Sequence, residues 1–422
     1  MKRICIALSV AAVCCTFAVK LPGAGAAMAA EKVIHAFGTG SDGQLPTARL
    51  TDVKGTLYGT TLSGGIHEKG TVFALDPTTG AEKVLYSFCS QQGCLDGEQP
   101  ESRLVDAGGT LYGTTYSGGT NSYYGTVFAL DPQTRQENVL YSFCSQPNCM
   151  DGAAPIAAPI DLNGALYGTT VYGGAYGHGT AFAIDPDTGA ETVLYSFCSQ
   201  QGCMDGEEPL AGLVDVNGML YGTTAEGGTY GYGTIFVIDP DTGAETVLYS
   251  FCGRQNCADG AYPRAALINV NGTLYGTTTS GGAKSYDGTV FAFDPTTNGE
   301  TVLYSFCEVQ KHHICKDGAM PWASLIDVDG TLYGTTIEGG TAINCHDGCG
   351  TIFGLDPVTQ TEQVVHAFQM NGTDGLEPVA GLVDVGGTLY GTTYYGGAAA
   401  AGTVYAVTPE VPGKVRGHQG RE

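Results

Sequence analysis

Cysteine is the residue type whose spacing in this sequence most directly indicates chemistry. Apart from Cys5, Cys14 and Cys15 near the N-terminus, the cysteines occur in six close pairs. The pairs are Cys89/Cys94, Cys144/Cys149, Cys198/Cys203, Cys252/Cys257, Cys307/Cys315 and Cys345/Cys349. Such spacing suits either a disulfide or two ligands of a zinc ion. Zinc needs four ligands and no second Cys or His pair accompanies each cysteine pair, so the spacing favours six local disulfides and no metal site.

Residues that could bind a ligand gather in the later part of the chain. Trp322 is the single tryptophan, and Trp and Arg are the residue types most enriched at binding hot spots. The candidate ligand-binding residues are Arg264, Trp322, His346, His312, Glu338 and Tyr286. His312 and His313 could also bind a metal, but neighbours in sequence point apart, so we expect no metal there. Sequence drift between copies is the alternative explanation of these unusual residues.

Carboxylates recur at a fixed place as Asp-Gly pairs. They are Asp42-Gly43, Asp96-Gly97, Asp151-Gly152, Asp205-Gly206, Asp259-Gly260, Asp317-Gly318 and Asp374-Gly375. A ring of carboxylates could attract a cation, but Asp before Gly is also typical of turns in which the side chain satisfies nearby amides, which we favour. The sequence contains no G-x-S-x-G, H-E-x-x-H or EF-hand motif. It therefore favours a binding protein over an enzyme and predicts no cofactor.

The elements that must position these residues repeat seven times. The phrase LYGTT begins at residues 57, 111, 166, 220, 274, 332 and 389, at spacings of 54 to 58 residues. The fourth unit predicts strands over 210–216, 219–224, 234–239 and 245–251. Asn217-Gly218 and the Asp-Pro-Asp-Thr-Gly segment from Asp239 are turn signals between them. No segment has a sustained 3.6-residue period, so we expect almost no helix.

Four short strands bury both faces when such sheets stack radially, which predicts an all-β, seven-bladed β-propeller with four antiparallel strands per blade. Residues 32–37 match the fourth strand of a unit, whereas the last unit has only three strands and ends at Val407. The N-terminal strand is therefore predicted to close the last blade. LYGTT is then the second strand of each blade, and its glycine is expected to permit close backbone approach.

The repeated phrase LYGTT..GG....GTVF.LDP.TG resembles the GloVer tandem repeat of exported bacterial proteins. The HAF segments at His35 and His366 are also similar to the extracellular HAF repeat. The resemblance covers nearly the whole chain after its N-terminal segment. It implies export and a propeller, and it implies no particular activity.

The N-terminus predicts a secretory signal over residues 1–29. A basic start is followed by an apolar run from Ile4 to Val19 and by a small-x-small cleavage site at Ala27-Met28-Ala29. We therefore expect a propeller over 30–410, a tail over 411–422, a secreted or periplasmic bacterial location, and no stable membrane insertion after cleavage. The net charge of −24 argues against nucleic acid as a partner. We expect a monomer.

The loops divide into two faces. The tight Asn-Gly and Asp-Pro turns should make one face, and the longer, variable loops after LYGTT and after the fourth strand should make the other. Variable loops on a rigid scaffold carry binding sites. The Cys345/Cys349 pair should lie in one such loop, around His346 and Asp347.

The residue after the proline that opens each unit should surround the mouth of the central channel. These residues are Thr47, Glu101, Ile156, Leu210, Arg264, Trp322 and Val379. We expect a glycan or protein ligand there. A polysaccharide lyase or hydrolase, or a structural surface protein, is the alternative.

Overall fold

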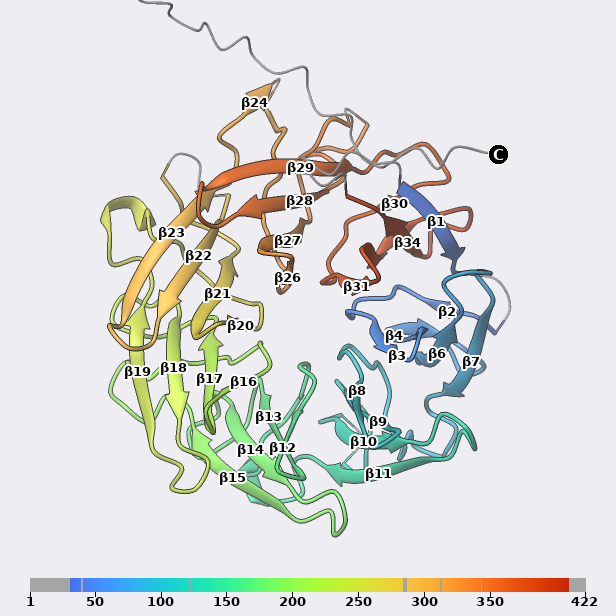
Figure 1. Ribbon diagram of the computed structural model, residues 1–422. Coiled ribbons are helices and arrows are strands. Elements are labelled where there is room, and N and C mark those ends of the chain that lie inside the picture. The colour runs from blue at the N-terminus through green and yellow to red at the C-terminus, as the bar shows by residue number, and fades with distance from the viewer. Residues whose placement is uncertain are drawn as a thin grey trace, which may run out of the picture.

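Seven four-stranded antiparallel sheets form a ring around a central axis (Figure 1). The computed structural model describes residues 31–38, 41–121, 123–283, 287–311, 313–342 and 344–409. The predicted signal segment over residues 1–29 and the predicted tail over 411–422 lie outside these ranges. Helix is confined, in the described residues, to the single 3₁₀ turns η1 (Pro147–Cys149) and η2 (Gln255–Cys257). The all-β, seven-bladed propeller is thus confirmed.

Each blade places its shortest strand at the axis and its LYGTT strand next to it (Figure 1). From the axis outward, blade one consists of β3 (Thr51–Val53), β4 (Thr56–Thr61), β6 (Thr71–Leu75) and β7 (Glu82–Ser87). Blade two consists of β8 (Val105–Ala107), β9 (Thr110–Thr115), β10 (Thr126–Leu130) and β11 (Glu137–Ser142). Blade three consists of β12 (Ile160–Leu162), β13 (Ala165–Thr170), β14 (Thr180–Ile184) and β15 (Glu191–Ser196), and blade four of β16 (Val214–Val216), β17 (Met219–Thr224), β18 (Thr234–Ile238) and β19 (Glu245–Ser250). Blades five to seven are β20 (Ile268–Val270), β21 (Thr273–Thr278), β22 (Thr289–Asp294), β23 (Gly299–Ser305); β26 (Ile326–Val328), β27 (Thr331–Thr336), β28 (Thr351–Asp356), β29 (Thr361–Ala367); and β31 (Val383–Val385), β32 (Thr388–Thr393), β34 (Thr403–Val407), β1 (Glu31–Ala36).

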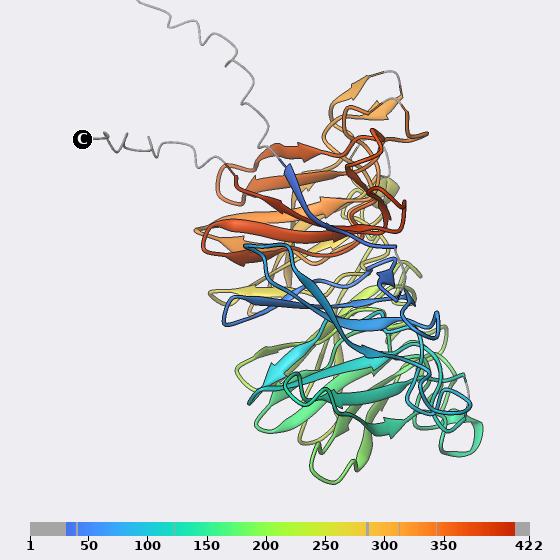
Figure 2. The same cartoon turned by 90° about the vertical axis from the view of Figure 1, so that its right-hand side faces the viewer.

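The N-terminal strand closes the ring, as predicted. Strand β1 pairs antiparallel with β34, from Glu31 opposite Val407 to Ala36 opposite Thr403. Figure 2 shows this blue strand lying against the red strands of the last blade. The closed ring leaves β1 as the outer strand of blade seven, so one sheet joins the two ends of the propeller.

The leucine, the glycine and the second threonine of LYGTT share one face of the strand, and this face is closely packed in every blade. Its leucine is fully buried in every blade, and its second threonine shares a hydrogen bond with the threonine that begins the third strand, as between Thr61 and Thr71 at 2.8 Å. The glycine has a different role from the one predicted. A Cβ on Gly59 would lie 2.5 Å from Cζ of Phe73, so the glycine makes room for an aromatic ring rather than for a backbone.

Aromatic rings join neighbouring blades. The phenylalanine that follows each outer strand packs against the aromatic residue in the third strand of the next blade, as Phe88 does edge-on against Phe128 at 5.1 Å between ring centroids. Phe37 and Phe73 make the same contact at 5.2 Å across the closure between blades seven and one. Each blade therefore buries its apolar faces by packing against the two neighbouring blades.

The innermost strands are shorter than predicted. In the fourth unit the predicted strand over 210–216 is reduced to Val214–Val216. The carbonyl oxygen of Ala211 instead accepts a hydrogen bond from the hydroxyl of Thr169 in blade three, at 2.9 Å. The segment before Val214 therefore bonds to blade three and does not extend strand β16 of its own sheet.

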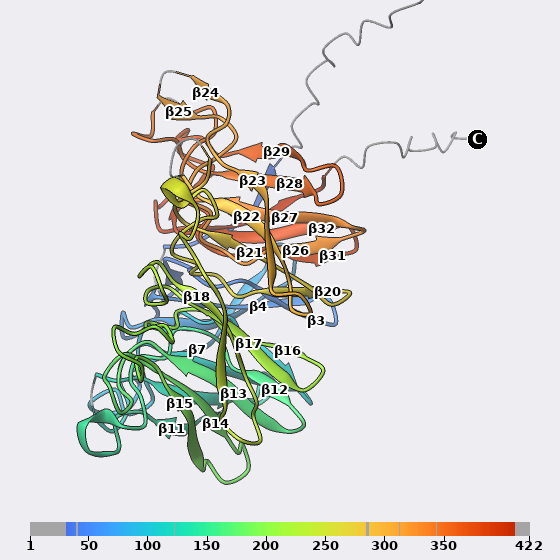
Figure 3. The ribbon, with the colours of Figure 1, turned by 90° about the vertical axis from the view of Figure 1, so that its left-hand side faces the viewer.

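The loops divide between the faces as expected. The loop after each outer strand pairs with the loop after LYGTT, as in the bridge between Glu98 and Ser117. Short pairs on this face are β2 (Gly43–Gln44) with β5 (Ser63–Gly64), β24 (Gln310–Lys311) with β25 (Ile314–Cys315), and β30 (Gly375–Leu376) with β33 (Tyr395–Gly396). Figure 3 shows β24 and β25 projecting from the edge of the ring. We call this side the long-loop face. The described residues include no helix long and apolar enough to cross a membrane.

Candidate functional site

The mouth of the central channel is a cavity of about 530 Å³ that all seven blades line. Each blade contributes the residue after its opening proline, and these residues are Thr47, Glu101, Ile156, Leu210, Arg264, Trp322 and Val379. The predicted ring of residues therefore exists. Leu62, Ile337, Glu377 and Tyr394 complete the wall. The cavity combines aliphatic walls with a few polar groups, as ligand pockets commonly do.

Two of the predicted binding residues are in direct contact at this mouth. The guanidinium carbon of Arg264, on blade five, lies 4.7 Å from the ring centroid of Trp322, on blade six. A cation at this distance is attracted to the face of an indole ring. Trp322 keeps 37% of its surface exposed, so its ring is available from the cavity side.

Two further arginines lie deeper in the channel. Two positions beyond the mouth residues, blades one and two carry Arg49 and Arg103, where the other blades carry only small residues: Ala158, Gly212, Ala266, Ser324 and Gly381. Within the part of the chain that the structure describes, no ion pair involves either guanidinium. Desolvation of the Arg49 guanidinium by the surrounding protein, followed by repulsion from the positive charge of Arg103, lowers the pKa of Arg49 to about 10.

A small residue on the neighbouring blade makes room for the Arg49 side chain. A Cβ on Gly381 would lie 3.5 Å from Cδ of Arg49, so the arginine side chain lies against the adjacent blade seven. Sequence reasoning identified the ring at the mouth and missed these arginines. The signal was present, because the residue two positions beyond each mouth residue points to the same side of an extended chain.

The remaining predicted binding residues are spread over the long-loop face. Glu338 is half-buried, and burial followed by the charges of Asp347 and Asp287 raises its pKa. His346 is 97% exposed and pairs with Asp347 at 2.8 Å between Nδ1 and Oδ2, outside the wall of the mouth. Tyr286 and His312 lie outside the described residues. The structure therefore brings Arg264 and Trp322 together and leaves His346 apart from them.

The recurrent aspartates have local partners, which agrees with the interpretation we favoured. Asp96 accepts hydrogen bonds from the Tyr86 hydroxyl at 2.7 Å and from the amides of Ser90 and Gln91 at 2.8 and 3.2 Å. The next blade adds Glu137 to this cluster, where burial and then Asp96 raise its pKa to about 8.

A glutamate occupies this place at all seven blade interfaces. The glutamates are Glu31, Glu82, Glu137, Glu191, Glu245, Glu300 and Glu362, and burial, the largest cause in each, raises their pKa values to about 7 or 8. A raised carboxyl pKa is often the sign of a catalytic acid. Sevenfold recurrence between blades indicates a structural role here.

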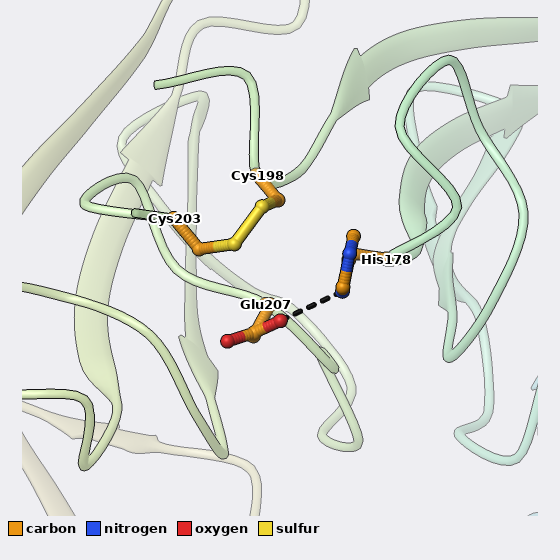
Figure 4. Close-up of side chains that lie close together, drawn as sticks. All are labelled: His178, Cys198, Cys203 and Glu207. Carbon is orange, nitrogen blue, oxygen red and sulfur yellow. Dashed lines mark ion pairs between the residues drawn. A yellow bond between two sulfur atoms is a disulfide. The ribbon is translucent and has the colours of Figure 1, made fainter. Parts of the chain in front are cut away.

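All six predicted disulfides are formed: Cys89–Cys94, Cys144–Cys149, Cys198–Cys203, Cys252–Cys257, Cys307–Cys315 and Cys345–Cys349. One of them has neighbours that the sequence did not reveal, because His178 and Glu207 lie beside Cys198 and Cys203 (Figure 4). His178 Nδ1 lies 2.7 Å from Glu207 Oε2, and the two sulfurs are bonded to each other. The thiolates that zinc requires are therefore consumed by the disulfide. Six disulfides indicate an oxidising extracellular or periplasmic environment.

The Cys345–Cys349 disulfide encloses His346 and Asp347 in the loop between β27 and β28, as predicted, and its two cysteines differ in burial. Cys345 is half-buried, as a loop residue can be, whereas Cys349 is only 1% exposed. Cys349 belongs to a hydrophobic cluster with Tyr333 and Phe368, because the chain enters strand β28 only two residues later. The disulfide therefore fastens the loop around His346 to the core of blade six, and Cys349 offers no surface to a ligand.

The Gloeobacter/Verrucomicrobia repeat matches residues 18–204, 124–345 and 308–416, which together span nearly the whole chain. The chain belongs to this repeat family. The resemblance of the LYGTT phrase to the GloVer repeat is thereby confirmed. No curated protein matches the sequence.

Solved structures share the propeller of this repeat family member at low sequence identity. An oligogalacturonate lyase in complex with manganese is 12% identical with a TM-score of 0.51, over 91% of this chain and 98% of the lyase. The extracellular domain of a protein described as a one component system from B. thetaiotaomicron is 10% identical with a TM-score of 0.55, over 89% of this chain and 39% of that one. These likenesses establish the fold, and they include an extracellular domain.

Proposed function

We propose that the protein is an exported binding protein that takes the end of an acidic oligosaccharide into the mouth of its central channel. The observation that carries this proposal is the set of three arginines along one channel. Arg264 lies at the mouth, and Arg49 and Arg103 lie below it. Such clustering is notable in a chain with 18 basic and 42 acidic residues.

The arginines favour a ligand that carries a carboxylate or a similar anionic group. A guanidinium forms two parallel hydrogen bonds with a carboxylate, and this recognition is stronger than that between neutral groups. Arg49 and Arg103 have no ion-pair partner among the described residues, so a ligand anion would satisfy two cations that already face the channel. The positive charges of Arg49 and Arg103 repel each other, and a bound anion would offset this repulsion.

The other polar groups of the mouth favour a sugar over a peptide. Glu101 and Glu377 line the cavity, and burial raises the pKa of each carboxyl. Carboxyl groups accept hydrogen bonds from hydroxyls, which a sugar offers in number. Trp322 and Tyr394 provide aromatic faces on which a sugar ring can stack. The oligogalacturonate lyase with the same fold acts on an acidic oligosaccharide, as its name says.

An array of uronic-acid oligosaccharides, neutral oligosaccharides, and acidic and neutral peptides, probed with the purified protein, tests the proposal. We expect binding to the acidic oligosaccharides, with a change in the fluorescence of Trp322. Binding to neutral sugars or to peptides alone would contradict the assignment of the ligand. Mass analysis of the bound oligosaccharide after incubation separates binding from cleavage, which a lyase or hydrolase would produce.

A further inference from the structure

Two of the seven blade interfaces differ from the other five in the residue that faces the aspartate. Five interfaces have a tyrosine there, at Tyr86, Tyr141, Tyr195, Tyr249 and Tyr304. The remaining two have histidine. His366 faces Asp374 between blades six and seven, and His35 faces Asp42 between blades seven and one.

Each histidine completes a compact set of three possible metal ligands. Glu31, His366 and Asp374 form one set, and Glu82, His35 and Asp42 form the other. In each set one imidazole nitrogen and two carboxylate oxygens lie within 4.8 Å of one another. We propose that these two clusters are binding sites for a divalent transition-metal cation such as Zn²⁺ or Mn²⁺. We name them the 6/7 cluster and the 7/1 cluster after the blades that they join.

The distances within the clusters suit such an ion. Nε2 of His35 lies 3.2 Å from Oδ2 of Asp42, and Nε2 of His366 lies 3.6 Å from Oδ2 of Asp374. Two ligands bound to zinc at about 2.0–2.1 Å in tetrahedral geometry are themselves about 3.3 Å apart. One nitrogen and two oxygens leave a fourth position for water.

The 6/7 cluster also contains buried atoms that lack a partner. Nε2 of His366 and Oε1 of Glu31 are buried and have no hydrogen-bond partner in the described part of the chain. The same glutamate oxygen is unpartnered at all seven interfaces, so it does not by itself indicate a metal. The imidazole nitrogen distinguishes these two clusters from the five interfaces that have tyrosine, because a tyrosine hydroxyl is a far weaker metal ligand than a neutral imidazole.

The histidines occur where the disulfide loop is missing. The five tyrosine strands are followed by the loops that contain Cys89/Cys94, Cys144/Cys149, Cys198/Cys203, Cys252/Cys257 and Cys307/Cys315. The loops after His35 and His366 contain no cysteine before the next aspartate. Disulfides and bound metals are alternative cross-links for structure that a hydrophobic core supports weakly. The two loops without a covalent cross-link are thus the two that carry the additional ligand.

Both clusters include a residue of the closing strand. Glu31 and His35 both belong to β1, which pairs with β34 and completes the ring. A cation in each cluster would tie β1 to blade six through His366 and Asp374, and to blade one through Asp42 and Glu82. The 6/7 cluster opens into a cavity of about 480 Å³ that Gln369, Asn371 and Thr373 also line, so an ion can enter from solvent.

Calorimetric titration of the chelator-treated protein with ZnCl₂ and with MnCl₂ tests the proposal. We expect two saturable sites per chain and a melting temperature that rises with metal concentration, since the ion binds the folded ring. His35→Tyr and His366→Tyr should each remove one site, and the double variant should remove both. These substitutions install the residue that the other five interfaces already hold, so the fold should persist.

Controls distinguish these clusters from other histidines. His346→Ala and His178→Ala, on the long-loop face, should leave both sites intact. X-ray absorption of the zinc-loaded protein should show nitrogen and oxygen ligands; sulfur ligands would place the ion at an opened disulfide and overturn the proposal, whether or not a variant folds. Two sites that survive in the double variant, or no saturable binding, would also overturn it. None of these outcomes depends on the ligand of the central channel.

Discussion

The hydroxyl of Thr392 in blade seven donates a hydrogen bond of 3.3 Å to the carbonyl oxygen of Ala48 in blade one, 344 residues away in sequence. The same bond joins every pair of neighbouring blades, through the first threonine of LYGTT. The other six run from Thr60 to Ser102, Thr114 to Ala157, Thr169 to Ala211, Thr223 to Ala265, Thr277 to Ala323 and Thr335 to Ala380. The seventh bond completes the circle.

Removal of the closing strand should open this circle. A chain that lacks residues 31–36 loses the partner of β34 and the contact between blades seven and one, so we expect a much lower melting temperature and a broader transition. Thermal unfolding followed by circular dichroism measures both. Lys32→Ala, at an exposed position of β1, is the control and should unfold like the wild type. An unchanged transition in the shortened chain would refute the closure.

Truncation at the channel mouth should weaken ligand binding with little loss of stability. Trp322→Ala and Arg264→Ala should each cost about 1–2 kcal/mol of binding free energy, as hot-spot truncations do. Tyr123→Ala, which removes a side chain that is 73% exposed on blade two, is the control and should change affinity less. Calorimetry with the oligosaccharide found by the array gives the three values. Affinity that falls only with Tyr123→Ala would move the site away from blades five and six.

The deeper arginines should decide the preference for an acidic ligand. Arg49→Ser and Arg103→Ala introduce residue types that other blades carry at the same position, so the channel should remain intact. Loss of a hydrogen bond to a charged group costs about 1.5–3 kcal/mol, which predicts at least a tenfold weaker binding of the acidic oligosaccharide. Arg135→Gly, in an exposed turn where several copies have glycine, is the control. Equal loss for acidic and neutral oligosaccharides would contradict an anion site.

The interface glutamates predict that the protein is less stable at pH 8 than at pH 5. Burial and Asp96 raise the pKa of Glu137 to about 8 in the folded state, above the value of 4.5 for an exposed glutamate. The folded state therefore binds this proton more tightly than the unfolded state. The resulting stabilisation is complete below about pH 4.5 and is lost as the pH rises through 8.

Denaturant unfolding at both pH values, with a chelator present, measures this effect. Glu137→Gln keeps a neutral side chain at every pH, so at pH 8 it should be more stable than the wild type by about 1–2 kcal/mol after allowance for solvent screening. At pH 5 the two proteins should differ little. A wild-type protein that is as stable at pH 8 as at pH 5 would show that these carboxyls ionise without cost.

The number of blades, the closure of the ring and the disulfides were all predictable from the sequence alone. The seven LYGTT phrases predicted the number of blades, and the match between 32–37 and the outer strands predicted the closure, because strand and turn patterns are local properties of the chain. The disulfides were predictable for the same reason, since each joins cysteines 4 to 8 residues apart. The burial of Cys349 was not, because it depends on how its loop packs onto blade six. The ring of residues at the channel mouth was predictable because the residue after the opening proline has the same place in all seven units.

The tertiary structure alone decided what meets between blades. The contact of Arg264 with Trp322, the position of Arg49 beside Gly381, and the approach of Glu31 to His366 all join residues of different units. Local patterns cannot reveal such contacts, because they depend on the angle and distance at which one sheet packs on the next. Sequence repetition determined that seven alike blades would form and close, since each can bury its faces only against a copy of itself. The side chains that differ between copies acquired their partners only when the closed ring brought distant units together.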